Sequence, residues 1–141
     1  MSNAVPHKPS STSADGARLG ELGLLTSDLM VVSRVRAAAA QLGWAVRQIG
    51  REEGISGIDL LLVDLNRDGS GQLARLRRLT GDGPAPEIVA FGHHMAVLEL
   101  RPLARAAGVR RVVANSALPR VLKLLVRRRE AEAVVAKVTK A

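Results

Sequence analysis

Short apolar runs alternate with amphipathic segments along most of the chain. Five of these runs predict β-strands, over residues 22–25, 44–49, 58–65, 87–91 and 109–114. The third run reads IDLLLVDL, and its block of Leu and Val is typical of a strand buried on both faces. Strands of that kind occur in parallel sheets with helices on both sides. The pattern therefore predicts a layered α/β domain.

Segments with helical spacing separate the predicted strands. The first helix should start at Thr26, Ser27 or Asp28, end near Leu42 and be closed by Gly43. Its core face would consist of Val31, Val35, Ala38, Ala39 and Leu42. Further helices are predicted over residues 71–79 and 95–107, and from Pro119 to residue 129, while residues 50–57 leave room for only one helical turn. Pro102 implies a kink or a late start in the third helix.

The alternation of strands and helices predicts a single five-stranded parallel sheet flanked by helices on both faces. This domain should span residues 19–129. Residues 1–18 are rich in Ser, Pro, Ala and Gly without a period, which predicts a disordered N-terminal tail. Residues 130–141 are expected to form a helical extension or a frayed tail.

The composition excludes several classes of protein. The chain has no cysteine, so it has neither disulfides nor a thiolate site, which fits a reducing cytoplasm. No apolar run approaches the roughly 18 residues of a membrane span, and no signal peptide is recognisable, so we expect a cytoplasmic protein without membrane insertion. Trp44 and Phe91 are the only aromatic residues, which disfavours base stacking on single-stranded nucleic acid.

Positive charge is concentrated in one part of the chain. The formal net charge is +8, and the nine basic residues from Arg101 to Arg129 are interrupted by no acid. Such a stretch favours an acidic protein partner, a nucleic-acid backbone or an anionic membrane surface. The simpler interpretation is a solvated face of an Arg-rich domain.

Polar residues follow the predicted strands, at the sheet edge where open α/β folds place their chemistry. The positions after the strands, two of them glycines, hold Thr26, Ser27 and Asp28; Gly50; Asp64 and Asn66; Gly92, His93 and His94; and Asn115 and Ser116. Asp64 is the acid that ends the most apolar strand. The pattern predicts a polar cleft with few charges.

The order of elements over about residues 20–129 resembles the receiver domain of two-component response regulators. The segments that carry the resemblance are LLTSD, DLLLVDLN, EIVAFG and AGVRRVVANS. The resemblance implies a receiver (flavodoxin-like) fold, and it assigns Asp64 to the position of the phosphoacceptor aspartate.

The other positions of the receiver site depart from the family pattern. The magnesium-binding acidic pair falls on Thr26 and Ser27, with Asp28 one place too late. The Thr or Ser after the fourth strand falls on Gly92 or His93, and the Lys after the fifth strand falls on Asn115.

Phosphoryl transfer to a carboxylate needs a metal ion and a cation to offset charge on the transferring oxygens. Magnesium is usually held by more than one carboxylate. Asp28 and Asp64 are the only candidate metal ligands of that kind in the cleft. We therefore interpret the chain as a degenerate pseudo-receiver without a cofactor, not an enzyme, in which Asp64 is a vestigial phosphoacceptor.

The sequence offers two other candidate metal sites. Residues 64–69 match the start of a calcium loop, but its twelfth position is Arg75, where a bidentate Glu is needed. A polar turn after a strand explains the same residues. His93 and His94 with Asp28 or Asp64 could also form a small site, although adjacent loop histidines usually point in different directions.

In receivers the fourth helix, fifth strand and fifth helix form the surface that dimerises or docks on partners, and the basic stretch corresponds to it. The hypothesis is a non-catalytic signalling or regulatory adaptor that binds an acidic protein, or a second copy of itself, through this face. The proposed contact residues are Arg101, Arg105, Arg110, Arg111, Lys123 and Arg127. The alternatives are a nucleic-acid-associated basic protein and a genuine phosphoacceptor that uses Asp64.

Overall fold

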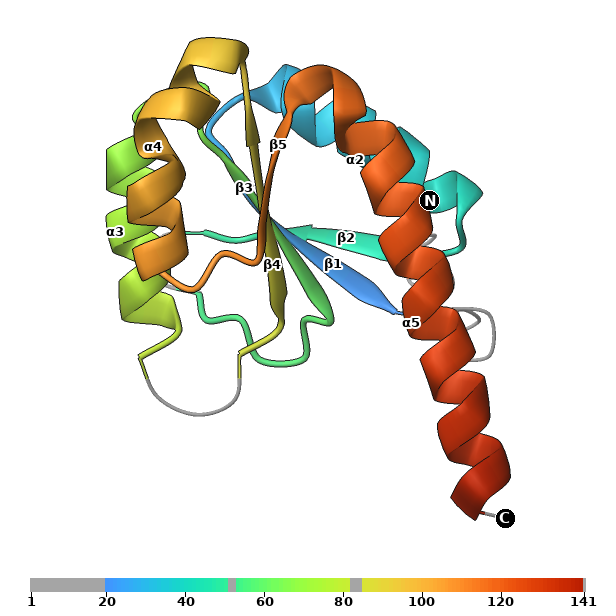
Figure 1. The fold of residues 1–141 in the computed structure, drawn as a ribbon. Helices are drawn as coiled ribbons and strands as arrows, with labels where there is room; N and C mark the ends of the chain where they lie inside the picture. The colour runs from blue at the N-terminus through green and yellow to red at the C-terminus, as the bar shows by residue number, and fades with distance from the viewer. Residues whose placement is uncertain (1–19, 51–52, 82–84, 141) are drawn as a thin grey trace, which may run out of the picture.

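The computed structural model describes residues 20–50, 53–81 and 85–140, without the side chains of the last two. The proposed N-terminal tail, residues 1–18, lies outside them. The strands are β1 (Glu21–Leu25), β2 (Ala45–Gln48), β3 (Leu60–Asp64), β4 (Glu87–Gly92) and β5 (Arg111–Ala114). They form one parallel sheet in the order β2-β1-β3-β4-β5 (Figure 1). The predicted five-stranded parallel sheet is confirmed.

Four helices connect or follow the strands: α2 (Leu29–Gln41), α3 (Gly69–Leu79), α4 (His94–Ala106) and α5 (Leu118–Lys140), the last preceded by a 3-10 turn over Asn115–Ala117. α4 contains Pro102 yet starts at His94, so the late start considered for this helix is wrong. The described part of the β2–β3 connection, residues 53–59, forms turns and no helix. No helix in the described ranges is both long and apolar enough to cross a bilayer.

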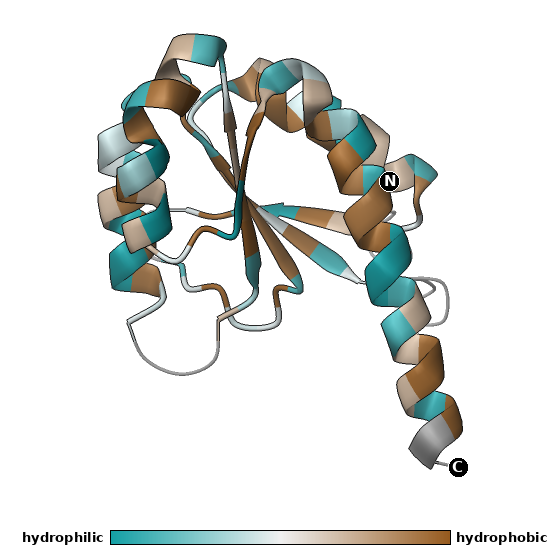
Figure 2. Cartoon of the chain, viewed as in Figure 1, coloured by the Kyte–Doolittle hydropathy of each residue, from teal (hydrophilic) through white to brown (hydrophobic). Residues whose placement is uncertain are grey.

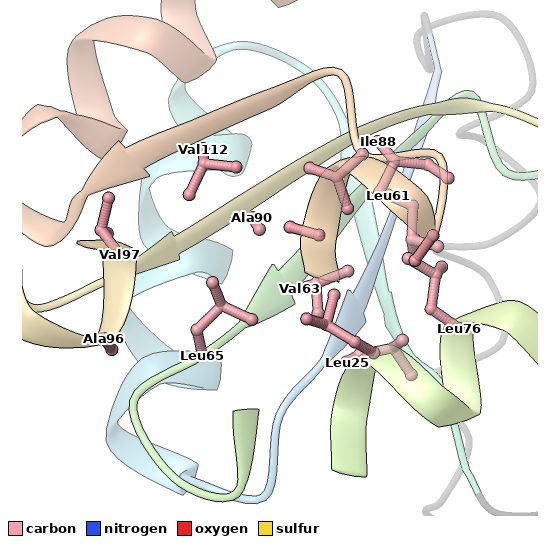
Figure 3. Packing of buried hydrophobic residues seen from close by; sticks show 14 of the residues in the cluster. Leu25, Leu61, Val63, Leu65, Leu76, Ile88, Ala90, Ala96, Val97 and Val112 are labelled. Carbon is pink, nitrogen blue, oxygen red and sulfur yellow. The ribbon is translucent and has the colours of Figure 1, made fainter. Parts of the chain in front are cut away.

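The sheet separates two apolar cores. α3 and α4 cover one face of the sheet, and α2 and α5 cover the other (Figure 1). Alternate side chains of β3 supply both cores: Leu61 and Val63 pack on the α3–α4 side, whereas Leu60 and Leu62 pack on the α2–α5 side. β3 is therefore hydrophobic along most of its length (Figure 2), and the α3–α4 core is shown in Figure 3. This two-sided burial is what the apolar run predicted.

The helix ends follow the capping residues that the sequence offers. Among the three candidate caps of α2, the structure uses Asp28, whose side chain accepts a hydrogen bond from the Met30 amide at 2.9 Å. Gly43 follows the C-cap of α2 with φ +79°, as predicted, and Gly108 follows α4 with φ +93°. These two glycines let the chain turn directly from a helix into the next strand.

The last helix is attached to the domain only along its first half. Its buried residues are Leu118, Leu122, Leu125 and Val126, in the α2–α5 core. Further along, the indole nitrogen of Trp44 donates to a Glu130 carboxylate oxygen at 3.2 Å. Beyond that point α5 continues to Lys140 and projects past the sheet (Figure 1).

Gly108→Ala should lower the free energy of unfolding by about 1–2 kcal/mol, because an L-residue is strained at its positive φ. No described atom lies within 4 Å of the position that its Cβ would take, so backbone strain would be the only cost. Gly54→Ala is the matched control: it has equally open surroundings and no positive φ. Urea denaturation of the two variants measures the difference. Equal stability of both variants would contradict the left-handed conformation of Gly108.

Candidate functional site

Asp64 ends the central strand, and its side chain is only 3% exposed. The Thr26 hydroxyl, from the end of β1, donates to one carboxylate oxygen at 2.6 Å. The backbone and side-chain nitrogens of Asn66 donate to the other oxygen at 2.8 and 2.7 Å. Both oxygens of the buried carboxylate are thus hydrogen-bonded, and all three donors are neutral.

Asn66 extends this hydrogen-bond network to the ends of β4 and β5. Its side-chain amide exchanges two hydrogen bonds with the amide of Asn115, at 3.1 and 3.0 Å. The Asn66 carbonyl oxygen also accepts from the backbone amide of His93 at 2.8 Å. The structure therefore brings Thr26, Asp64, Asn66, His93 and Asn115 together at the carboxyl edge of the sheet; we call these five residues the Asp64 network.

The other acid of the cleft has a different role. The Asp28 carboxylate caps α2, and the backbone amide of Asp28 donates to the Thr26 hydroxyl at 3.0 Å. Thr26 thus links the start of α2 to Asp64. The backbone carbonyl of Thr26 also accepts from the Gln48 side chain at 3.0 Å, which connects β2 to the same point. Asp28 is occupied within its own helix turn and does not complete a pair with Asp64.

The histidines take part in α4. The His93 ring nitrogen Nδ1 accepts from the Ala96 amide at 3.3 Å and caps the helix, and the exposed His94 is its first residue. Among the residues that the structure describes, no group of three or more His, Cys, Asp or Glu side chains could hold a metal ion. The arrangement therefore gives no support to the His–Asp metal site considered above.

The segment with the calcium-loop pattern forms a tight turn between β3 and α3. Asp68 has φ +50° and precedes α3 without a side-chain capping bond. The Arg75 guanidinium donates to the backbone carbonyls of Ile49, at 2.9 Å, and Gly50. Since Asp64 points into its network and Arg75 fixes the end of β2, the geometry favours the polar turn.

All six predicted contact residues of the basic stretch are exposed, but they divide into separate groups. Arg101 and Arg105 lie one turn apart on α4. Arg110 lies just before β5 and donates its amide to the Ile88 carbonyl. Arg101 and Arg105 thus lie on the C-terminal half of α4, and Arg110 directly precedes β5.

Glu87 organises the basic residues on the α5 side of the sheet. Its carboxylate lies 3.8 Å from Arg111 and 4.0 Å from Arg129. Arg129 lay within the basic stretch but was not among the predicted contact residues. The sequence alone does not predict this group of ion pairs, because it depends on the pairing of β4 with β5.

Lys123 lies away from the β5 edge. It precedes Glu130 by seven residues, so the two share one side of α5. Glu130 contacts Trp44, next to β2, and β2 and β5 are opposite edges of the sheet. Arg127, one turn after Lys123, is displaced from β5 in the same direction. The six residues therefore do not form one continuous face, because α5 presents Lys123 and Arg127 on a different side from Arg110 and Arg111.

Several solved structures similar to this chain are response-regulator receiver domains or CheY-like proteins. A receiver (CheY-like) protein from Methanospirillum hungatei JF-1 superposes with a TM-score of 0.60 at 17% identity, covering 81% of this chain and 95% of that one. The CheY-like protein TadZ from Pseudomonas aeruginosa PAO1 gives 0.64 at 21% identity, with 78% and 98% covered. The BeF3-activated receiver domain of DrrB, from Thermotoga maritima, gives 0.58 at 17% identity, with 78% and 96% covered.

These similarities confirm the receiver fold over most of the chain. No protein-family model matches the sequence. No curated protein matches it either. The class that the structure defines is thus a CheY-like receiver fold, whose site residues differ from the family pattern at Thr26, Ser27 and Asn115.

Thr26→Val should lower the free energy of unfolding by about 1–3 kcal/mol, because the isosteric change leaves a buried Asp64 oxygen and the Asp28 amide without a partner. Ser27→Ala, at the exposed next position, is the control and should change stability by less than about 0.5 kcal/mol. Thermal and urea denaturation measure both. If Thr26→Val were as stable as the control, the Thr26–Asp64 hydrogen bond would make no net contribution.

Proposed function

We propose that this chain is a pseudo-receiver, a signalling or regulatory module that acts by protein–protein contact and not by phosphoryl transfer. The absence of cysteine supports the cytoplasm as its location. The proposal rests on the environment of the Asp64 side chain. Its carboxylate is buried, and the polar groups around it are neutral.

The neutral surroundings of Asp64 lack two kinds of group that phosphorylation requires. A magnesium ion beside Asp64 would need further carboxylate ligands, and Thr26 and Ser27 provide only hydroxyl oxygens. The transferring phosphoryl group would need a cation, and the corresponding side chain, Asn115, is a neutral amide already bonded to Asn66. Phosphorylation would also have to break the hydrogen bonds that stabilise Asp64.

Beryllofluoride with magnesium, a mimic of the phosphorylated state, should leave the amide NMR spectrum of this protein unchanged around Asp64, Asn66 and Asn115. The same treatment of the DrrB receiver domain, whose structure was determined in a BeF3-activated form, is the positive control. Shifts confined to the Asp64 network would show that the carboxylate accepts the group, and the chain would then be a genuine phosphoacceptor.

The contact surface that we propose is centred on Arg101, Arg105 and Arg110. On α4 the exposed Arg101 and Arg105 lie within two turns of Leu98, which is 56% exposed. An exposed apolar side chain bordered by arginines suits a protein partner with an acidic rim around an apolar centre. Arg111 contributes less to this surface because Glu87 already neutralises part of its charge. Lys123 and Arg127 are outside it.

Arg105→Glu combined with Arg110→Glu should abolish capture of the partner in a pull-down. Arg34→Glu combined with Arg36→Glu, on the exposed side of α2, changes the net charge equally and should retain the partner. The comparison separates a specific surface from a general effect of charge.

Binding to generic duplex DNA at low salt provides the second measurement. A nucleic-acid-associated protein would bind DNA with an affinity that falls steeply as salt rises, and both double variants would weaken it. Partner loss in both variants, or in neither, would contradict the proposed surface.

A further inference from the structure

The last helix is longer than the domain that supports it. α5 has 23 residues; near its middle Arg129 meets Glu87 and Glu130 meets Trp44. The described side chains from Ala131 to Val138 are all exposed. A helical segment of this length is marginal in water without tertiary packing. Packing against another surface would therefore stabilise the projecting half of α5.

The projecting half also carries apolar side chains on one side. Val134, Val135 and Val138 are 60%, 62% and 70% exposed, and Figure 2 shows hydrophobic residues on this part of the helix. Val138 follows Ala131 by seven residues and Leu124 by fourteen, so the three fall nearly on one line. Leu124, in the supported half, is itself 60% exposed.

This line points away from the domain. Leu124 is two residues from the buried Leu122, which places it about 200° around the helix. We call Leu124, Ala131, Val135 and Val138, with Val134 beside them, the outer stripe of α5. Between Leu124 and Ala131 this side of the helix carries the charged Arg127 and Arg128.

We propose that the outer stripe binds the outer stripe of a second copy of this chain, with the two α5 helices antiparallel. In this arrangement the projecting half of each helix lies on the supported half of the other. The valines of one copy then cover the exposed Leu124 of the other. Such a contact is two-fold symmetric and closes on itself, as most homodimers do.

The residues fit one antiparallel register. With Leu124 set against Val135 of the second copy, Arg128 meets Ala131 near the centre. The long Arg128 side chain thereby faces the smallest residue of the stripe and can lie along it with its charge in water.

The charges of α5 favour the same orientation. Residues 118–129 carry five basic side chains and no acid, and the acids of the helix, Glu130 and Glu132, follow directly. An antiparallel pair sets Glu132 of one copy beside Arg128 of the other. A parallel pair would place Arg127, Arg128 and Arg129 next to their own copies, where like charges repel.

This dimer does not depend on the proposed function, because the outer stripe shares no residue with the surface around Arg101, Arg105 and Arg110. A single pair of short helices buries less area than a standard interface. The association should therefore be weak and dependent on concentration.

Sedimentation equilibrium on the full chain tests whether the copies associate. Leu124→Glu should weaken dimerisation at least tenfold, and far-UV circular dichroism should show the fold intact because the side chain is exposed. Leu29→Glu, the same change at an exposed position on α2, should leave the dimer unchanged. A monomer at every concentration, or a dimer broken by Leu29→Glu and not by Leu124→Glu, would overturn the proposal.

Cysteine cross-linking tests the orientation, since the native chain has no cysteine. A mixture of the Leu124→Cys and Val135→Cys proteins should form a disulfide-linked dimer under mild oxidation. Leu124→Cys alone should not, because the two copies of this position would be about 16 Å apart along an antiparallel pair. Cross-linking of Leu124→Cys alone would indicate a parallel pair, and no cross-linking in the mixture would exclude this register; either result overturns the proposed arrangement.

Discussion

The burial of β3 on both faces is the constraint on which the rest of the structure depends. Leu60 and Leu62 pack against α2 and α5, while Leu61 and Val63 pack against α3 and α4. Helices cover both faces of this strand, and β1 and β4 pair with its two edges, so its last residue, Asp64, lies inside the protein. An acid in that position must have hydrogen-bond partners, because an unsatisfied buried carboxylate is very unfavourable.

The partners of Asp64 decide what the site can do. Ordinary phosphoacceptor chemistry would require acids and a cation around the carboxylate, whereas this chain supplies the hydroxyl of Thr26 and the amide of Asn66, supported by Asn115. The same groups join the ends of β1, β3 and β5. A feature that is a reaction centre in active receivers thus becomes, in our proposal, a structural connection between strands, and the interacting surfaces lie elsewhere on the fold.

Those surfaces follow from the way the helices lie on the sheet. α4 presents Arg101 and Arg105 beside the exposed Leu98, whereas α5 directs its buried residues to the sheet and its outer stripe to solvent. The basic stretch that is continuous in the sequence is therefore divided in space. Glu87 draws Arg111 and Arg129 together at the amino edge of the sheet, and Lys123 and Arg127 point away from them.

Although it left the N-cap of α2 open among Thr26, Ser27 and Asp28, the sequence by itself determined the parallel α/β architecture, the burial of β3 on both faces and the end of α2 at Gly43. These features depend on local periodicity and on the backbone preferences of single residues. Only the tertiary structure decided that Thr26 bonds Asp64, 38 residues away, and that Asn66 bonds Asn115, 49 residues away. It also decided which basic residues share a surface. Such contacts depend on strand order and on the rotation of each helix about its axis, which no local pattern specifies.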